Sequence, residues 1–252
     1  MILKYSAFVL CAFLLLCFSS CISSAAKAEE YYALGAGYFE IKKYTEAEGW
    51  FIKSKFHKTT KLASEYYLGR IAYETGRYKE AEAYFEQIIR EDKENITALR
   101  AAAYTCIKME ELPKAESYYK RILELVPEAY DEGYNYALVL LALGKTEEAE
   151  KLLLKFNNTE DPKSLLILAR AQKLQGKPEA ADAYNTSLTL EDDPLVRIEY
   201  AKYLESIGLN DKALEEYRKA LENSALSEEK KEEIENAIEQ LETDGKSGSE
   251  TD

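Results

Sequence analysis

The stretch that decides the fold is LGRIAYETGRYKEAEAYF, residues 68–85, compared with its earlier counterpart LGAGYFEIKKYTEAEGWF, residues 34–51. The two segments start 34 residues apart and share a Leu-Gly pair at the beginning and a phenylalanine at the end. One alanine keeps this period through four copies, at Ala47, Ala81, Ala115 and Ala149. A period of this length is typical of arrays in which one helix-turn-helix motif stacks on the next. The sequence therefore predicts a helical repeat architecture.

Small residues recur where the two helices of each repeat are expected to cross, because a small side chain lets two backbones approach closely. On the first helices these residues are Gly35, Gly69, Ala103, Ala137, Ala169 and Ala201. On the second helices the alanine period continues to Ala181 and Ala213. A third set of positions is predicted to end the first helices in a left-handed conformation, and these are Gly76, Gly144, Gly176 and Gly208.

Two steps of the period are shortened. The spacing is 32 residues from Ala149 to Ala181 and again from Ala181 to Ala213. An Asp-Pro pair lies at each joint, Asp161-Pro162 and Asp193-Pro194. Aspartate is a preferred N-cap and proline is favoured at the first helical position, so each pair predicts a helix start. The shortened steps therefore indicate tightened turns and not broken repeats.

This pattern resembles the tetratricopeptide repeat, in which Leu-Gly is followed by Tyr, by Ala-x-x-x-Phe and by Pro. Tyr38 matches in the first repeat, and Pro127 closes the third. The resemblance implies an all-α fold, a right-handed α-solenoid of about six repeats with a C-terminal capping helix. The expected repeats are 29–61, 62–95, 96–129, 130–161, 162–193 and 194–225.

The C-terminal segment 226–242 is predicted to form the capping helix. Ser227 can act as its N-cap, and Ile234, Ile238 and Leu241 form one apolar stripe that would cover the last repeat. The alternative is a separate coiled-coil partner helix. Residues 243–252 have little to bury and are expected to be disordered.

The N-terminus predicts export. Residues 1–20 combine one early lysine with a short apolar run, as a signal peptide does. The segment 18–21, Phe-Ser-Ser-Cys, resembles a bacterial lipobox, which implies lipidation of Cys21, a tether over 21–28 and a membrane-anchored lipoprotein facing the periplasm. The alternative is cleavage after Ala28, which would release a soluble periplasmic or secreted protein. The inner or outer membrane leaflet stays open.

The formal net charge of −13 argues against a nucleic-acid partner, which requires a basic surface. The same charge makes the chain as a whole poorly suited to an anionic leaflet, so membrane attachment is expected to come from the lipid anchor.

No residues with the pattern of an active site stand out. The sequence has one histidine, His57, and contains neither G-x-S-x-G nor a P-loop. Cys106 falls at a helix-packing position and is expected to be a small buried hydrophobe. We therefore expect no enzyme activity, no cofactor and no metal.

In tetratricopeptide arrays the first helices line a concave groove, and the resemblance carries that role to particular positions here. The expected partner-binding residues are Tyr32, Phe39, Tyr66, Arg70, Tyr73, Arg100, Tyr104, Tyr134, Arg170, Lys173 and Lys202. Tyrosine and arginine combine apolar area with hydrogen bonding and often anchor interfaces. This chemistry suits an extended peptide or a helix that carries carboxylates. The alternative is that these tyrosines pack in the core and that each arginine pairs with a neighbouring glutamate.

The function expected from the sequence is a non-enzymatic scaffold of the bacterial cell envelope that holds a protein or peptide partner. Its likeness to tetratricopeptide lipoproteins suggests outer-membrane protein or pilus secretin assembly. The alternative is a ligand-binding component of a transporter, with the tyrosine-lined groove as a small-molecule pocket. Exposed tyrosine-rich faces could also pair two copies of the chain.

Overall fold

The computed structural model describes residues 24–156, 160–224 and 226–248. Within these residues every regular element is a helix, which confirms the predicted all-α fold. The helices group into two compact units, unit 1 (Met1–Pro127) and unit 2 (Glu128–Asp252), so the division falls between the third and fourth predicted repeats.

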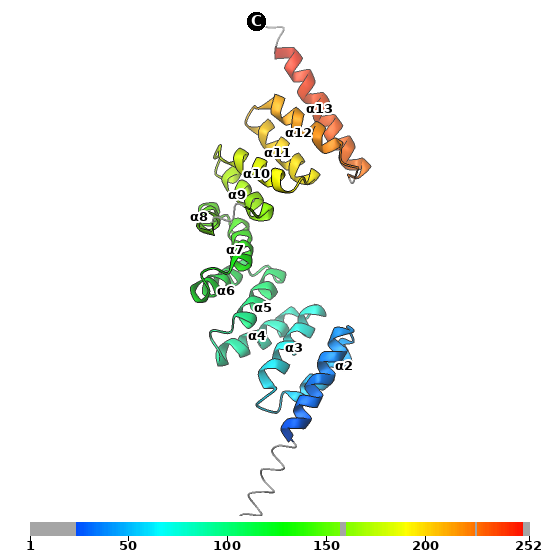
Figure 1. Ribbon diagram of the computed structural model, residues 1–252, viewed down its shortest axis with the longest axis vertical. Helices are drawn as coiled ribbons and strands as arrows, with labels where there is room; N and C mark the ends of the chain where they lie inside the picture. The colour runs from blue at the N-terminus through cyan, green and yellow to red at the C-terminus, as the bar shows by residue number, and fades with distance from the viewer. Residues whose placement is uncertain (1–23, 157–159, 225, 249–252) are drawn as a thin grey trace, which may run out of the picture. The chain divides into compact units, whose positions relative to one another are not determined.

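Unit 1 begins with a helix over residues 24–40, and Figure 1 shows the later helices in chain order. Its labelled helices are α2 (Tyr44–Ser54), α3 (Lys61–Glu74), α4 (Tyr78–Glu91), α5 (Ile96–Lys108) and α6 (Leu112–Leu125). Within unit 1, α3 packs on α4 and α5 packs on α6 as repeat pairs, and α4 also packs on α5.

Unit 2 holds the remaining helices of the described chain. They are α7 (Tyr130–Ala142), α8 (Thr146–Phe156), α9 (Pro162–Leu174), α10 (Ala180–Leu190), α11 (Pro194–Ser206), α12 (Asn210–Leu221) and α13 (Glu228–Gly248). The pairs α7 with α8, α9 with α10, and α11 with α12 are in close contact, as the repeat pattern predicts.

The turns inside the repeats share one backbone motif. The four glycines predicted to be left-handed have positive φ: Gly76 (76°), Gly144 (74°), Gly176 (68°) and Gly208 (77°). The amide after each glycine bonds to a carbonyl five residues back, as Arg77 N does to Ala72 O at 2.8 Å. The same bond follows Lys42 and Glu110, whose φ values are 57° and 60°. The sequence missed these two turns because neither residue is a glycine.

We expect Glu110→Gly to stabilise the protein by about 1 kcal/mol, because a left-handed backbone is strained for residues with a Cβ. Gly144→Ala, at the equivalent turn, should shift stability in the opposite direction. Urea unfolding of both variants checks this, and a less stable Glu110→Gly protein would contradict it.

The predicted close approach of paired helices is confirmed at Gly69. A Cβ on Gly69 would lie 2.7 Å from the ring of Phe85, and one on Gly35 would lie 2.9 Å from the ring of Phe51. In the fourth repeat the close contact involves another pair of residues. The ring of Phe156, at the end of α8, occupies the space that a Cβ on Gly133 would need. Both phenylalanines opposite Gly35 and Gly69 are fully buried.

We expect Gly69→Ala to destabilise the protein by about 1–3 kcal/mol, because the new methyl group forces the Phe85 ring out of a packed core. Gly37→Ala is the matched control. Gly37 is also helical but has nothing within 4 Å of its Cβ direction. There the better helix propensity of alanine should stabilise by up to about 1 kcal/mol. Thermal unfolding of the pair measures both effects, and equal shifts would refute the packing argument.

The helix starts predicted at the shortened joints are confirmed. The Asp161 carboxylate accepts from the amides of Lys163 and Ser164, and Pro162 is the first residue of α9. The Asp193 carboxylate accepts from the amides of Leu195 and Val196 at the start of α11.

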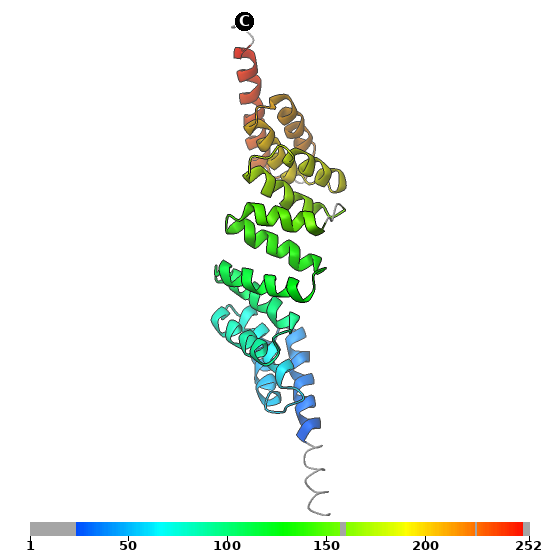
Figure 2. The same cartoon turned by 90° about the vertical axis from the view of Figure 1, so that its left-hand side faces the viewer.

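The capping helix α13 packs on α12 within unit 2, and Figures 1 and 2 show the two helices together near the C-terminal end. Its stripe residues Ile234 and Leu241 are buried in the core of this unit, and Ile238 packs beside them. The Ser227 hydroxyl accepts a bond from the amide of Lys230, as expected of an N-cap. The helix continues to Gly248, which corrects the prediction that disorder begins at residue 243. Residues 249–252 lie outside the described residues.

At the N-terminal end, residues 24–28 belong to a helix, which corrects part of the prediction of a tether over residues 21–28. Ala28 is buried, and its carbonyl accepts a bond of 2.8 Å from the Ser54 hydroxyl. The predicted signal peptide (1–20) and Cys21 lie outside the described residues. Among the residues that are described, no helix combines the length and hydrophobicity needed to cross a bilayer.

Candidate functional site

A cavity of about 360 Å³ opens in unit 1 between the first helices of two consecutive repeats. Five of the predicted partner-binding residues line it together: Tyr66, Arg70, Tyr73, Arg100 and Tyr104. The first three lie on α3 and the other two on α5. The structure therefore brings together the predicted residues of the second and third repeats.

Helical spacing explains why these side chains converge. Tyr66, Arg70 and Tyr73 are four and then three residues apart, so they share one face of α3, and Arg100 and Tyr104 share a face of α5. With the 34-residue period, Arg100 occupies the position in its repeat that Tyr66 occupies in the preceding one, and Tyr104 the position of Arg70. Tyrosine and arginine thus exchange places from one repeat to the next. α3 offers Arg70 between two tyrosines, and α5 offers Arg100 beside Tyr104.

Phe85 of α4 also lines the cavity. It is the residue that packs against Gly69, and its ring centroid lies 5.9 Å from that of Tyr66. The cavity therefore has an apolar base that belongs to the packed core, with polar groups around it. An arrangement of a few polar groups over apolar walls is typical of binding sites.

Arg70 is held over aromatic rings. Its guanidinium lies 4.6 Å from the ring centroid of Phe39 and 5.8 Å from that of Tyr67. No described carboxylate forms an ion pair with Arg70. Stacking on ring faces leaves the in-plane N–H groups of an arginine able to donate to a carboxylate. Arg70 is therefore oriented without being neutralised.

Tyr73 supplies a hydrogen-bond donor. Burial raises its pKa above the usual tyrosine value, and the neighbouring Tyr78, Glu74 and Tyr104 add to the effect. The phenol is therefore protonated at neutral pH.

Glu74 is the one carboxylate among the residues that line the cavity, and two arginines, Arg70 and Arg100, line it as well. The site as a whole favours an anionic group with an apolar neighbour.

Four lining residues were not predicted: Glu74, Phe85, Thr97 and Ala101. Glu74 and Thr97 lie four residues after Arg70 and three before Arg100, on the same helix faces. Helical spacing from the predicted residues could have found them. Phe85, which the repeat pattern singled out only as the phenylalanine ending the segment 68–85, belongs both to the core and to the cavity lining.

The predicted residues of the first repeat have a different place. Phe39 is only 7% exposed and belongs to the core with Phe51 and Leu68, which corrects its assignment to the groove. Tyr32 packs its ring 5.6 Å from that of Phe51 and 5.9 Å from that of Tyr67. Aromatic residues at the positions of Tyr32 and Phe39 fit a core as well as a groove, so the sequence alone could not decide between these two roles. Phe39 acts beneath Arg70 as a support.

In unit 2 the predicted cations are largely paired. Arg170 makes a bidentate contact with Glu199, with Arg170 Nη2 2.7 Å from Glu199 Oε2, and the Tyr184 hydroxyl donates to the same carboxylate at 2.7 Å. Tyr134 and Lys173 lie close enough to act on this pair electrostatically. Lys202 pairs with Glu233 of α13 at 2.6 Å. The alternative raised from the sequence, arginine paired with glutamate, applies to Arg170.

Burial by itself would raise the pKa of Glu199, but hydrogen bonds from Arg170 and Tyr184 outweigh it, so the net pKa is lowered. A lowered carboxyl pKa contributes stability above the unfolded value of about 4.3, and this contribution disappears as the pH falls through the folded value.

We therefore expect Glu199→Gln to cost about 1–2 kcal/mol at pH 7, discounted because Arg170 is partly exposed. The difference from the unchanged protein should shrink as the pH falls below about 4. Urea unfolding across pH 3–7 measures it, and a difference that stays constant with pH would contradict the linkage.

Two other polar clusters have structural explanations. Glu82, Cys106 and Glu111 lie within metal-ligand reach of one another, but Lys114 already pairs with both carboxylates, at 3.0 and 2.5 Å. Cys106 is fully buried, as predicted, and burial and the nearby Glu82 raise the pKa of its thiol to about 12. A protonated thiol is a poor nucleophile and metal ligand.

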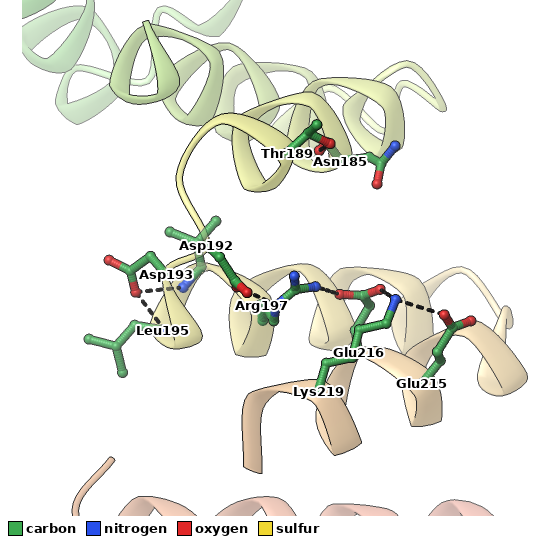
Figure 3. Close-up of polar contacts among 10 residues, drawn as sticks. Asn185, Thr189, Asp192, Asp193, Leu195, Arg197, Glu215, Glu216 and Lys219 are labelled. Carbon is green, nitrogen blue, oxygen red and sulfur yellow. Dashed lines mark hydrogen bonds and ion pairs between the residues drawn. The ribbon is translucent and has the colours of Figure 1, made fainter. Parts of the chain in front are cut away.

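Figure 3 shows the second cluster, a chain of ion pairs in unit 2. Arg197 of α11 contacts Asp192 at 2.6 Å and Glu216 of α12 at 2.5 Å, and Lys219 joins Glu216 to Glu215. The side chains of Arg197 and Glu216 are 15% and 11% exposed. These ion pairs therefore hold α11 against α12.

Residues 72–131, which include α4, α5 and α6, match the family model described as tetratricopeptide repeat. This segment of the chain is therefore identified as tetratricopeptide repeat. This confirms the resemblance drawn from the repeat pattern. No curated protein sequence matches the chain.

Several solved structures share the fold of this chain. A tetratricopeptide repeat protein from Parabacteroides merdae is 20% identical, with 80% of this chain and 82% of that chain covered and a TM-score of 0.70. MamA from Desulfovibrio magneticus is 16% identical, with 64% and 93% covered and a TM-score of 0.61. YrrB, described as having an unusual peptide-binding site, is 16% identical, with 66% and 87% covered and a TM-score of 0.58.

Proposed function

We propose that this protein is a non-enzymatic interaction scaffold that binds an acidic peptide or protein segment in the cavity between α3 and α5. The observation that carries the proposal is the convergence of two arginines and three tyrosines from consecutive repeats on one apolar-based cavity. Arg70, which no described carboxylate neutralises, supplies a place for a carboxylate of the partner. Phe85 and the tyrosine rings supply a place for an adjacent apolar side chain.

The likeness to YrrB supports a peptide as the occupant, since that protein has the same fold and its description names a peptide-binding site. A scaffold role also agrees with the chemistry of the described residues, where the polar clusters are occupied by ion pairs and the buried thiol of Cys106 is protonated.

Export and lipidation at Cys21 complete the proposal, and with them a partner in the bacterial cell envelope. The packing of residues 24–28 supports cleavage before Cys21 over cleavage after Ala28. A chain that started at residue 29 would lose the buried Ala28 and its bond to Ser54. Outer-membrane protein or secretin assembly is the role we propose for such a scaffold, and pairing of two copies is compatible with it.

A second candidate function is binding of a small anionic ligand in the same cavity, as part of a transport system. Its volume of about 360 Å³ favours this reading, because it falls within the range of small-molecule sites, about 300–1,000 Å³.

The test is crosslinked co-purification from native membranes with Arg70→Glu/Arg100→Glu. Reversal of both charges should weaken a partner that uses this site by at least about thirtyfold, as expected for interface anchors. Arg170 is left unchanged because it pairs with Glu199.

The matched control is Arg90→Glu/Arg121→Glu, which makes the same charge change outside the cavity of unit 1, at an exposed and a partly exposed position. Selective loss of one envelope protein from the Arg70/Arg100 variant supports the scaffold. Recovery of the same proteins with both variants contradicts it. Native mass spectrometry that finds a small molecule on the unchanged protein, and not on the Arg70/Arg100 variant, supports the second candidate.

A further inference from the structure

We infer that unit 1 carries a contact surface for an anionic phospholipid bilayer at the end of α2. This surface, the Phe56 surface, comprises Trp50, Ile52, Lys53, Lys55, Phe56 and Lys58. It is separate from the cavity between α3 and α5, none of whose lining residues belong to it.

The local charge of this surface is opposite to that of the chain. Residues 50–61 contain four lysines and no acidic residue, although the whole chain has a formal net charge of −13. Lys61 pairs with Glu91. Lys53, Lys55 and Lys58 make no ion pair with a described carboxylate, and neither does Lys27 on the adjoining helix. Even with the exposed Glu29 and Glu30 of that helix counted, the surface stays positive.

Large apolar side chains stand among these cations. Phe56 is 81% exposed, which is the highest value among the large hydrophobic residues of the described chain, and Ile52 is 41% exposed. Lys53 Nζ lies 4.1 Å from the ring centroid of Trp50 and 5.8 Å from that of Tyr31. Aromatic rings beside lysines match the interfacial layer of a bilayer, where ring and ammonium meet headgroups and the outer acyl chains. Transfer of an exposed phenylalanine side chain from water to the apolar part of a bilayer is favourable.

The surface lies at the end of unit 1 where the described chain begins. The bond from the Ser54 hydroxyl to the Ala28 carbonyl holds the end of α2 against the first turns of the helix 24–40. Lys27 Nζ and Lys53 Nζ approach the same ring, that of Tyr31, at 6.0 and 5.8 Å. Residue 24 follows Cys21 by three positions, a reach of at most about 11 Å. A lipid on Cys21 would therefore hold this surface close to the membrane.

The attraction of this surface to anionic headgroups depends on its local charge and not on the net charge of the chain. At physiological ionic strength, exposed charges are screened beyond about 8 Å, so the headgroups respond to the nearest lysines more than to distant glutamates. A basic and aromatic surface beside a lipid anchor also supplies a second membrane signal, and two signals hold a protein far better than one. The surface would fix which end of unit 1 faces the bilayer.

The experiment uses the mature chain, residues 21–252, with Cys21→Ser so that no lipid contributes. It is mixed with vesicles of phosphatidylcholine alone or of phosphatidylcholine and phosphatidylglycerol at 3:1. Trp50 is the single tryptophan of the chain, so its fluorescence reports on this surface alone. Brominated lipids will quench it if it approaches the acyl chains. Sedimentation gives the partition coefficient.

We expect binding to the anionic vesicles only, weakened by salt, with quenching of Trp50. Lys53→Gln/Lys55→Gln/Lys58→Gln should lower the partition coefficient about a hundredfold, at about fivefold for each lysine. Its matched control is Lys108→Gln/Lys120→Gln/Lys151→Gln, at exposed lysines elsewhere. Phe56→Ser should abolish the quenching, whereas Leu174→Ser, at another exposed apolar residue, should not.

Equal loss in the two lysine variants, or no binding of the unchanged chain to anionic vesicles, overturns the inference. Vesicle binding that persists in the Phe56 surface variants, with loss of a crosslinked protein instead, assigns the surface to a protein partner and overturns it too. The Arg70→Glu/Arg100→Glu variant should keep vesicle binding. This outcome separates failure of the membrane surface from failure of the proposed peptide site.

Discussion

The close contact between a glycine on one helix and an aromatic ring on the next is the interaction on which the packing of the first two repeats depends. At Gly69 there is no room for a single methyl group against Phe85, and Gly35 faces Phe51 in the same way. Each helix pair alone leaves an apolar face exposed, so the paired helices are stable only when stacked. The cavity inherits its base from this contact, since Phe85 is both the ring packed on Gly69 and a lining residue.

The same packing separates binding positions from structural ones. Arginine occurs at equivalent places in both units, with different results. Arg70 lies over the rings of Phe39 and Tyr67 and has no described carboxylate partner, whereas Arg170 is held by Glu199 and Tyr184. Glu199 is partly buried, with its side chain 25% exposed, and a partly desolvated carboxylate is favoured when a cation and hydrogen bonds satisfy it. Arg170 is thus better placed to hold α9 against α11 than to meet a partner.

Charge also has to be considered locally. The overall excess of acidic residues describes most of the surface, but residues 50–61 are basic, and Phe56 stands exposed among them. Two surfaces of unit 1 can therefore attract anionic groups of different kinds, one around the cavity and one at the end of α2. Neither follows from net charge, since screening confines each field to its own neighbourhood.

The sequence by itself determined the repeat period, the left-handed turns at Gly76 and Gly144 and the Asp-Pro helix starts, because all of these depend on local spacing. Five residues of the cavity were expected from the resemblance to tetratricopeptide arrays, which assigns the groove positions. The left-handed turns at Lys42 and Glu110 could not be predicted from the sequence, since neither position holds the glycine that usually marks such a turn. Only the tertiary structure decided that Phe39 is core, that Arg170 is paired and that Lys27 and Lys53 share the ring of Tyr31. The physical reason is that these outcomes depend on neighbours from other helices, which a periodic pattern along one chain does not specify.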